Sequence, residues 1–382
     1  LNEGLQVIEN AAFYGCTALR SVIIPSTVIG LGRYAFAACK SLIELQLNEG
    51  LRVIWESAFN GCTSLQSVTL PSTVTELEDW AFWGCFELVE LQLNEGLEII
   101  GQGAFKNCKS LRSVTVPSTV TVLDNLAFCD CSNLVEVQLN EGLGFIGGGA
   151  FHTCTALRSV TIPSTVTELG ACLFSGCTNL SEVIFLGGKR LFNQEFFDCC
   201  VRREEQGLLD RDAINEILFD EEGDFTFHGC QMTTVKISIS WALNERMARL
   251  PRECMLSVEE KIRNLHFLDL IPDGDILVCF PVVRMAAGDE ADDDQDDDTF
   301  ELRDTNNETA RSLCQVLQLI AFHELKESSI LLELALWKSK IDESTSVARE
   351  DCRVAIPDPA KSLIMKYCGF AGFLEPAIEG SR

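Results

Sequence analysis

Apolar and polar residues alternate in short segments that recur every 23 residues through the first 200 positions. In one such segment Val68 and Leu70 flank Thr69, a period of two that predicts a β-strand with one buried face. A turn of sequence NEG or PST follows, where glycine and proline redirect the chain for opposite backbone reasons. Val28 and Leu31, which come after the first PST turn, predict a second, shorter extended segment in each unit.

A column of phenylalanine and cysteine marks the same period. A phenylalanine stands three residues before each of nine cysteines spaced 23 apart. The cysteines are Cys16, Cys39, Cys62, Cys85, Cys108, Cys131, Cys154, Cys177 and Cys200, and the phenylalanines run from Phe13 to Phe197. A constant spacing of this length is typical of one structural unit stacked on itself. We expect the segment from phenylalanine to cysteine to form roughly one turn of helix on the far side of the unit.

Two versions of the unit alternate, so self-similarity is strongest at 46 residues. One version carries LNEG, beginning at Leu1, Leu47, Leu93 and Leu139, and the other carries PSTV after Ile24, Leu70, Val116 and Ile162. A degenerate ninth unit begins at Phe185 and keeps Phe197 and Cys200. Phe227, Gly229 and Cys230 later restore the F-x-G-C spacing before Val235 and Ile237, which predicts one or two degenerate repeats with an insertion.

These residues resemble a known family. The string LPSTVTELEDWAFWGCFELVELQL, residues 70–93, is similar to the BspA-type leucine-rich repeat, and the resemblance extends over residues 1–200. It implies a solenoid that serves adhesion, recognition and protein–protein contact, with no catalysis in the repeats. The expected fold is an α/β repeat solenoid, a right-handed leucine-rich-repeat coil with one parallel sheet face, followed by a mainly helical C-terminal region.

Strand residues that alternate with the buried positions must face solvent on the sheet side. They form two polar columns, from which we predict a binding face made of Glu44, Gln46, Ser67, Thr69, Glu90, Gln92, Ser113, Thr115, Glu136 and Gln138. Glutamates two units apart lie about 9.5 Å from one another, too far to share a proton or one metal ion. The pattern suits an extended polar or basic partner. The alternative is that a solvated sheet face simply requires polar residues.

Trp55, Trp80 and Trp83 fall at variable positions on the opposite side of the unit. Exposed tryptophans would mark a contact patch, whereas packing against neighbouring turns is the alternative.

The predicted organisation has four parts. Residues 1–240 form the solenoid, regular over 1–200 and degenerate over 201–240. Residues 241–285 hold capping helices and a short strand, with Ser240 as N-cap of a helix to Leu250, and Ser257 with Glu260 opening a second helix. Residues 286–304 form an acidic flexible linker. Residues 305–382 form a helical module whose first helix opens at Thr305 and Glu308.

The linker contains eight acidic residues in ten between Asp289 and Asp298. Such a run repels itself and stays solvated. A calcium loop is the alternative, but glycine is missing at its sixth position and the closing glutamate is out of register. In the last module, Leu313, Val316, Leu317 and Ile320 mark one helix face, and a final helix is expected from Asp358 to Gly369.

The formal net charge of −27 argues against nucleic acid and anionic membranes as partners, because both attract basic patches. Eighteen cysteines are present, which permits a disulfide-rich secreted protein. Nine of them share one structural position, however, which favours buried free thiols and a reducing, intracellular compartment. The chain begins in mid-repeat at Leu1, so we expect its native N-terminus to lie upstream.

Motifs for catalysis are weak. The four histidines are scattered, and His323-Glu324 is followed by Glu327 where a zinc helix needs histidine. We therefore predict a non-enzymatic interaction scaffold with no cofactor, no metal and no membrane span, which binds a protein or peptide. The alternatives are a cell-surface adhesin or receptor ectodomain fragment and, least favoured, an enzyme within residues 241–382.

Overall fold

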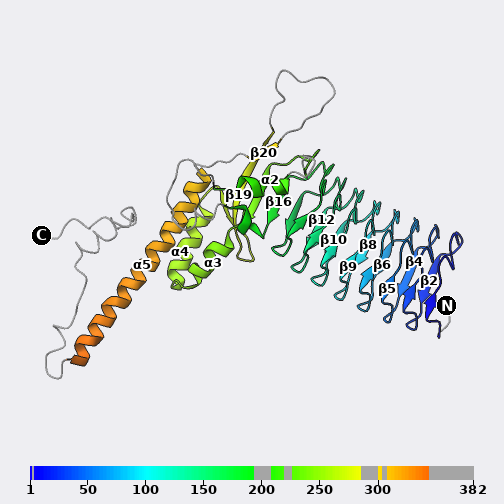
Figure 1. Cartoon of the computed structure of the whole chain (residues 1–382), viewed down its shortest axis with the longest axis horizontal. Helices are drawn as coiled ribbons and strands as arrows, with labels where there is room; N and C mark the ends of the chain where they lie inside the picture. Colours follow the sequence, from blue (N-terminus) through cyan, green and yellow to red (C-terminus); the bar gives the residue numbers. More distant parts are fainter. Residues whose placement is uncertain (2–3, 193–207, 219–225, 285–299, 303–307, 344–382) are drawn as a thin grey trace, which may run out of the picture. The chain divides into compact units, whose positions relative to one another are not determined.

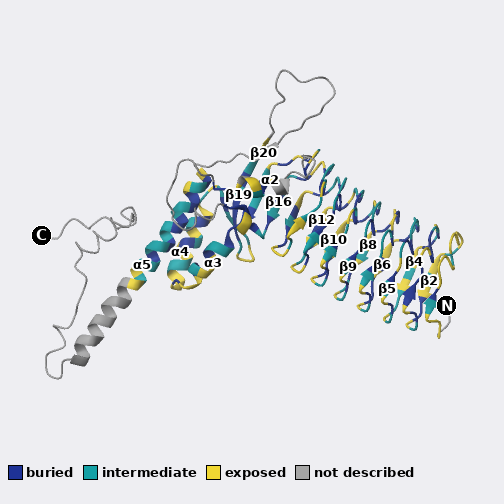
Figure 2. Ribbon diagram, in the orientation of Figure 1, coloured by how far each residue is buried: buried dark blue, intermediate teal, exposed yellow. Residues whose placement is uncertain are grey.

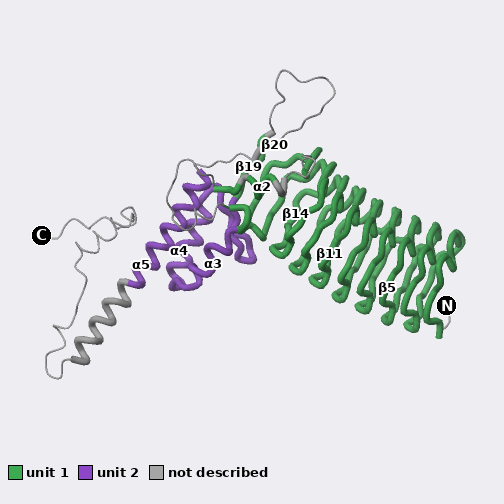
Figure 3. The backbone as a smooth tube through the Cα atoms, viewed as in Figure 1, with its two compact units in different colours: residues 1–193, 207–238, 279–304 green, residues 194–206, 239–278, 305–382 purple. Residues whose placement is uncertain are grey.

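The structure is a computed structural model that describes residues 1, 4–192, 208–218, 226–284, 300–302 and 308–343. The chain divides into two compact units (Figure 3). Unit 1 comprises Leu1–Asn193, Gly207–Ser238 and Cys279–Asp304, and unit 2 comprises Gln194–Gln206, Ile239–Val278 and Thr305–Arg382.

Unit 1 is a solenoid whose turns stack in sequence order (Figure 1). Each turn contributes one longer and one shorter strand. The longer strands are β2 (Ser21–Ile24), β4 (Glu44–Leu47), β6 (Ser67–Thr69), β8 (Glu90–Gln92), β10 (Ser113–Val116), β12 (Glu136–Leu139), β14 (Ser159–Ile162) and β16 (Glu182–Phe185). The shorter strands are β1 (Val7–Ile8), β3 (Gly30–Leu31), β5 (Val53–Ile54), β7 (Glu76–Leu77), β9 (Ile99–Ile100), β11 (Val122–Leu123), β13 (Phe145–Ile146) and β15 (Glu168–Leu169).

All these strands run parallel, and the predicted leucine-rich-repeat solenoid is confirmed. The shorter strands form one continuous sheet in the order β1-β3-β5-β7-β9-β11-β13-β15. The longer strands are hydrogen-bonded in groups that begin with a PSTV repeat: β2–β4, β6–β8, β10–β12 and β14–β16. The 46-residue alternation of the sequence is therefore an alternation of strand pairing.

Phenylalanine rings form the centre of the core. Successive rings from Phe13 to Phe174 lie 4.9 to 5.8 Å apart between centroids, and each pair is within 9° of parallel. Phe36 through Phe174 are almost completely buried. Stacked rings of this kind bury large apolar areas and add about 0.5–1.5 kcal/mol per pair beyond that burial.

The far side of each unit consists of turns, and the expected turn of helix is not formed there. Tyr34 and Ala38 have φ values of 56° and 58°, outside the helical region. The amide of Phe36 donates to the carbonyl oxygen of Ala58 in the next unit, 2.8 Å away. Backbone amides on this side therefore alternate between partners in the next repeat and partners in their own, whereas a helical turn would keep all these bonds within one repeat.

The stack continues past an insertion. Phe227 stacks on Phe174 with centroids 5.6 Å apart, and Cys230 Sγ donates to the Phe174 carbonyl at 3.1 Å. Strand β17 (Thr234–Ser238) pairs in parallel with β16. Phe197 and Cys200, expected at this place in the column, lie outside the described residues. The insertion includes the 3-10 helix η1 (Gly188–Leu191) and helix α2 (Arg211–Leu218).

A long strand extends the sheet beyond β17. Strand β19 (Ile276–Arg284) follows β17 in the sheet order, and the amide of Val282 donates to Thr233 O at 2.9 Å. It confirms the strand predicted within residues 241–285. Its Phe280 is fully buried and packs against Phe192 with centroids 6.3 Å apart. Strand β20 (Phe300–Leu302) pairs with the end of β19 in antiparallel orientation.

Unit 2 contains α3 (Ser240–Ala248), α4 (Arg252–Arg263), β18 (Leu268–Leu270) and α5 (Glu308–Glu343). Two predicted helix starts are wrong. Ser240 does not cap α3. Its hydroxyl oxygen instead accepts a hydrogen bond from the backbone amide of Ile276, 2.9 Å away. Helix α4 begins after Pro251, so Ser257 lies inside the helix. The C-terminal region therefore contains helices and strands, since β18 pairs with the first residues of β19.

Helix α5 is described from Glu308, and the four residues predicted to mark one helix face, Leu313, Val316, Leu317 and Ile320, are all buried. Arg246 of α3 holds Glu324 of α5 through two hydrogen bonds of 3.0 and 2.7 Å. The described residues do not include Thr305 or the helix expected from Asp358. They also leave out most of the acidic segment 286–304. The predicted domain boundaries, and the capping of the solenoid by residues 241–265, stay predictions.

Candidate binding face

The outward side chains of the longer strands β2 to β16 form a surface that we call the sheet face. More exposed positions alternate with buried or half-buried ones along these strands, and β10 has a strict exposed-buried-exposed-buried pattern (Figure 2). All ten residues predicted for the binding site are exposed. The period-two pattern was sufficient to place them, because each alternates with the inward-facing residues of its strand.

Strand register brings the predicted residues side by side. Ser67 pairs with Glu90 and Thr69 with Gln92 in β6–β8, and Ser113 pairs with Glu136 in β10–β12. Thr115 Oγ1 donates a hydrogen bond to Gln138 Oε1, 3.3 Å away, in the same strand pair β10–β12. The face therefore presents alternating rows, one with small hydroxyl residues and the next with glutamate and glutamine.

The glutamines are held in place by asparagines of the adjoining turn. Gln46 Nε2 donates to Asn48 Oδ1 at 3.1 Å, and Asn48 Nδ2 donates to the carbonyl oxygen of Ile24 at 2.9 Å. Equivalent side-chain bonds join Gln92 to Asn94 and Gln138 to Asn140. This network orders one edge of the face before any partner binds, which lowers the entropic cost of binding.

The central glutamates have no partner of their own. Among the described residues, no ion pair or side-chain hydrogen bond involves Glu44, Glu90 or Glu136. Glu182, the last glutamate of this column, differs because Lys236 Nζ lies 2.8 Å from its Oε2. At about 10 Å in water, two carboxylates repel by only about 0.4 kcal/mol. Repulsion among the three carboxylates is therefore weak.

The sheet face has a third column of exposed residues, which was not predicted from the sequence. It alternates basic or amide residues with aliphatic ones: Arg20, Ile43, Gln66, Val89, Arg112, Val135 and Arg158. The aliphatic members are 39–51% exposed. The amides of Ile43 and Glu44 both donate to Arg20 O, at 2.9 and 3.2 Å, and this irregularity leaves two successive side chains exposed. Arginine recurring at 20, 112 and 158 was the available signal.

The acidic residues of the NEG turns have a structural role. Glu95 accepts hydrogen bonds from the backbone amide and hydroxyl of Ser118, at 3.2 and 3.1 Å. The backbone bond from Ser118 is the main cause that lowers the pKa of the Glu95 carboxyl. Glu49 and Glu141 bond to Ser72 and Ser164 in the same way. These three glutamates join the LNEG turns that begin at Leu47, Leu93 and Leu139 to the PST turns that follow them.

The tryptophans lie on the turn side of the solenoid. Trp55 and Trp83 are 36% and 39% exposed. Trp80 packs closely over Gly103 of the next unit, where an added Cβ would lie 2.3 Å from its ring. Trp83 meets Trp80 edge to face with centroids 6.4 Å apart. Neighbour packing thus accounts for Trp80, while Trp55 and Trp83 keep part of their rings in solvent.

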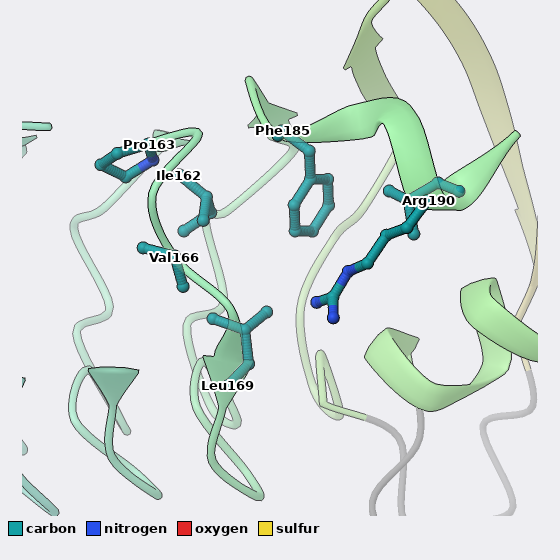
Figure 4. Close-up of a pocket in the computed structure, with 8 residues that line it drawn as sticks. Ile162, Pro163, Val166, Leu169, Phe185 and Arg190 are labelled. Carbon is teal, nitrogen blue, oxygen red and sulfur yellow. The ribbon is translucent and has the colours of Figure 1, made fainter. Parts of the chain in front are cut away.

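A small hollow lies near the end of the regular repeats. Ile162, Val166, Leu169 and Phe185 give it apolar walls, and the side chain of Arg190 points toward it from η1 (Figure 4). Within the described ranges, no group of three or more histidine, cysteine or acidic residues is arranged to hold a metal ion. No described helix is long and apolar enough to cross a membrane.

Comparisons with known proteins agree with this architecture. A family model described as "BspA type Leucine rich repeat region (6 copies)" matches residues 1–112 and again residues 98–208. No curated protein matches the chain. Among solved structures, a leucine-rich repeat protein from Bacteroides ovatus is 27% identical, with 48% of this chain and 54% of that protein covered and a TM-score of 0.39. The match therefore spans about half of that protein's length.

Two further structures are similar. The leucine-rich repeat protein of T. pallidum is 32% identical, with 47% of this chain and 74% of that protein covered and a TM-score of 0.38. A leucine rich cell surface protein from Faecalibacterium prausnitzii is 22% identical, with 50% and 76% covered and a TM-score of 0.26.

Proposed function

This chain belongs to the BspA-type leucine-rich repeat family, and from that premise we propose that it is a non-enzymatic recognition scaffold whose sheet face binds a protein or peptide. The observation that carries the proposal is the row of exposed glutamates at Glu44, Glu90 and Glu136, none of which forms an ion pair or side-chain hydrogen bond with the described residues. They stand on a rigid framework beside glutamines that are already oriented by Asn48, Asn94 and Asn140.

The composition of the face supports an interaction role. Partly exposed aliphatic side chains at Ile43, Val89 and Val135 lie beside the carboxylates. Apolar area gives a protein partner surface to bury, while charged and amide groups define its orientation. The repeats themselves resemble a scaffold that carries no catalysis, and the face is a surface of exposed strands, which suits a macromolecular partner better than a small substrate.

Selection of ligands tests this role. A displayed library of random linear peptides should be selected against the intact chain and then counter-selected against the variant E44K/E90K/E136K. The proposal expects the enriched peptides to bind the original chain and to lose binding to the variant. Enriched peptides that bind both chains equally would place the recognition surface elsewhere.

A further inference from the structure

The spacing of charges on the sheet face narrows the class of partner. Glu44, Glu90 and Glu136 occur in every second repeat, so neighbouring carboxylates are separated by one step between hydrogen-bonded strands and one step between strands that are not hydrogen-bonded, roughly 10 Å in all. The intervening repeats place Ser67 and Ser113 in the same column. A partner that lies across the strands therefore meets a negative charge about every 10 Å, with hydroxyl groups between the charges.

Three regular backbones can be compared with this period. A polyproline II helix has three residues per turn and rises about 3.1 Å per residue, so every third side chain returns to one face after about 9.3 Å. An extended β-strand rises about 3.3 Å per residue, but its residues i and i+3 point to opposite faces. An α-helix repeats after seven residues, about 10.5 Å. Period alone thus leaves the polyproline II helix and the α-helix.

Hydrogen-bond donors on the sheet face distinguish the polyproline II helix from the α-helix as a partner. Thr69 and Ser113 present hydroxyls, and Arg112 and Arg158 present guanidinium groups that form no ion pair among the described residues. A polyproline II backbone makes no internal hydrogen bonds, so its carbonyl oxygens are free to accept from such donors. The carbonyl oxygens of an α-helix are already bonded within the helix. Only the polyproline II partner satisfies both the charge period and the donors.

The aliphatic column completes the fit. Ile43, Val89 and Val135 are exposed in the same repeats as the three glutamates. Proline rings that alternate with basic residues would pack on these side chains, as proline-rich ligands do on apolar grooves elsewhere. Resting on the proposed function, we propose that the sheet face binds a proline-rich segment in polyproline II conformation that carries a lysine or arginine at every third residue.

The arginines restrict where a basic partner can place its charges on the sheet face. Arg112 and Arg158 lie one residue before the glutamate column, in the intervening repeats. A uniformly basic partner that spread over both columns would be repelled there. A single basic row, aligned with the glutamates, leaves the arginines facing the neutral backbone of the partner. Charge spacing, and not charge total, is therefore the property that should govern affinity.

Three synthetic peptides test the spacing. The first is four Lys-Pro-Pro triplets, which places lysine at every third residue. The second contains the same four lysines and eight prolines with the lysines consecutive, so that charge and conformation are kept and spacing is lost. The third is a helix-forming peptide with lysine at every seventh residue. Binding to the intact chain would be measured by fluorescence anisotropy at 150 mM salt.

We expect the triplet peptide to bind at least tenfold more tightly than either of the others. That preference should disappear in E44Q/E90Q/E136Q, whose thermal melt should match that of the original chain. Equal affinity for the triplet and clustered peptides, tighter binding of the helical peptide, or no binding of the triplet peptide would each overturn this inference. These three outcomes would leave the library selection, and with it the proposed function, unaffected. A triplet preference that survives in the variant would contradict both.

Discussion

The thiol of Cys62 donates a hydrogen bond to the carbonyl oxygen of Phe36, with Sγ 3.2 Å from the oxygen. The same bond recurs along the stack and joins Cys39 to Phe13, Cys85 to Phe59, Cys108 to Phe82, Cys131 to Phe105, Cys154 to Phe128, Cys177 to Phe151 and Cys230 to Phe174. Cysteine is small and apolar enough for the core, yet it still supplies a donor. The buried cysteines of the column therefore have a structural role in each of these turns.

Removing one of these thiols should destabilise the solenoid. In Cys108→Ala the carbonyl oxygen of Phe82 loses one of its two donors and keeps the amide of Cys85, and a small cavity is left, so we expect the free energy of unfolding to fall by about 1–3 kcal/mol. Urea unfolding measures the change. Cys16→Ala is the matched control, because Cys16 occupies the same column but is exposed. Equal losses in the two variants would contradict the role assigned to the buried bond.

Buried thiols also predict loss of stability in alkali. Burial raises the pKa of the Cys62 thiol from 9.0 to about 12, and the neighbouring Cys39 contributes a smaller part of this increase. Between these two pH values the unfolded chain releases the proton and the folded chain keeps it, so stability is full below about pH 9 and falls as pH rises toward 12. Urea unfolding at a series of pH values should show a shallower alkaline decline for a Cys62→Ala variant. An unchanged slope would refute this assignment.

Gly103 should be intolerant of any side chain. Its φ is +59° and an added Cβ would lie 2.3 Å from the Trp80 ring. Strain and overpacking together should lower the free energy of unfolding of Gly103→Ala by roughly 2–4 kcal/mol. Gly15→Ala has a similar φ of +69° with nothing within 4 Å, and should lose less. If chemical denaturation gives the same loss for both variants, the contact with Trp80 is not responsible.

His323 predicts a weakening of unit 2 in acid. Its ring is mostly buried, and neither ring nitrogen has a hydrogen-bond partner in the structure. Burial and then Lys326 lower its pKa below 6.5, with Glu327 acting in the opposite direction. The unfolded chain binds the proton more readily, so stability should decline as pH falls below about 6.5. Tryptophan fluorescence across pH 4.5–8 should show a smaller decline for His323→Leu than for the original chain.

Sequence periodicity was sufficient to predict the solenoid, because equivalent residues of successive repeats pack in the same environment. Phe82 and Cys85 are buried for the reason that Phe59 and Cys62 are, and one register predicts them all. The exposed positions of β6 and β8 followed from the same alternation. The ten candidate residues could therefore be placed on one face, although their role in binding stays a prediction.

Other features depend on bonds that periodicity does not encode. The turn side forms no helix because Phe36 bonds to Ala58 in the next repeat. Ser240 resembled a helix cap, but its hydroxyl bonds to Ile276, which is far away in sequence. The exposure of Ile43 arises from a local irregularity at Arg20 O. Each of these features reflects a contact between segments, which single-segment propensities cannot predict.

The central claim is that Glu44, Glu90 and Glu136 form the recognition surface. Calorimetric titration of a selected peptide ligand into the original chain, E44K/E90K/E136K and E9K/E98K/E168K tests it most directly. Glu9, Glu98 and Glu168 are exposed but lie outside the sheet face, so both variants change the net charge by the same amount. The proposal predicts at least a hundredfold loss of affinity in the first variant and less than a threefold loss in the second, with unchanged melting temperatures. Equal losses in the two variants would show that total charge, rather than this face, determines binding.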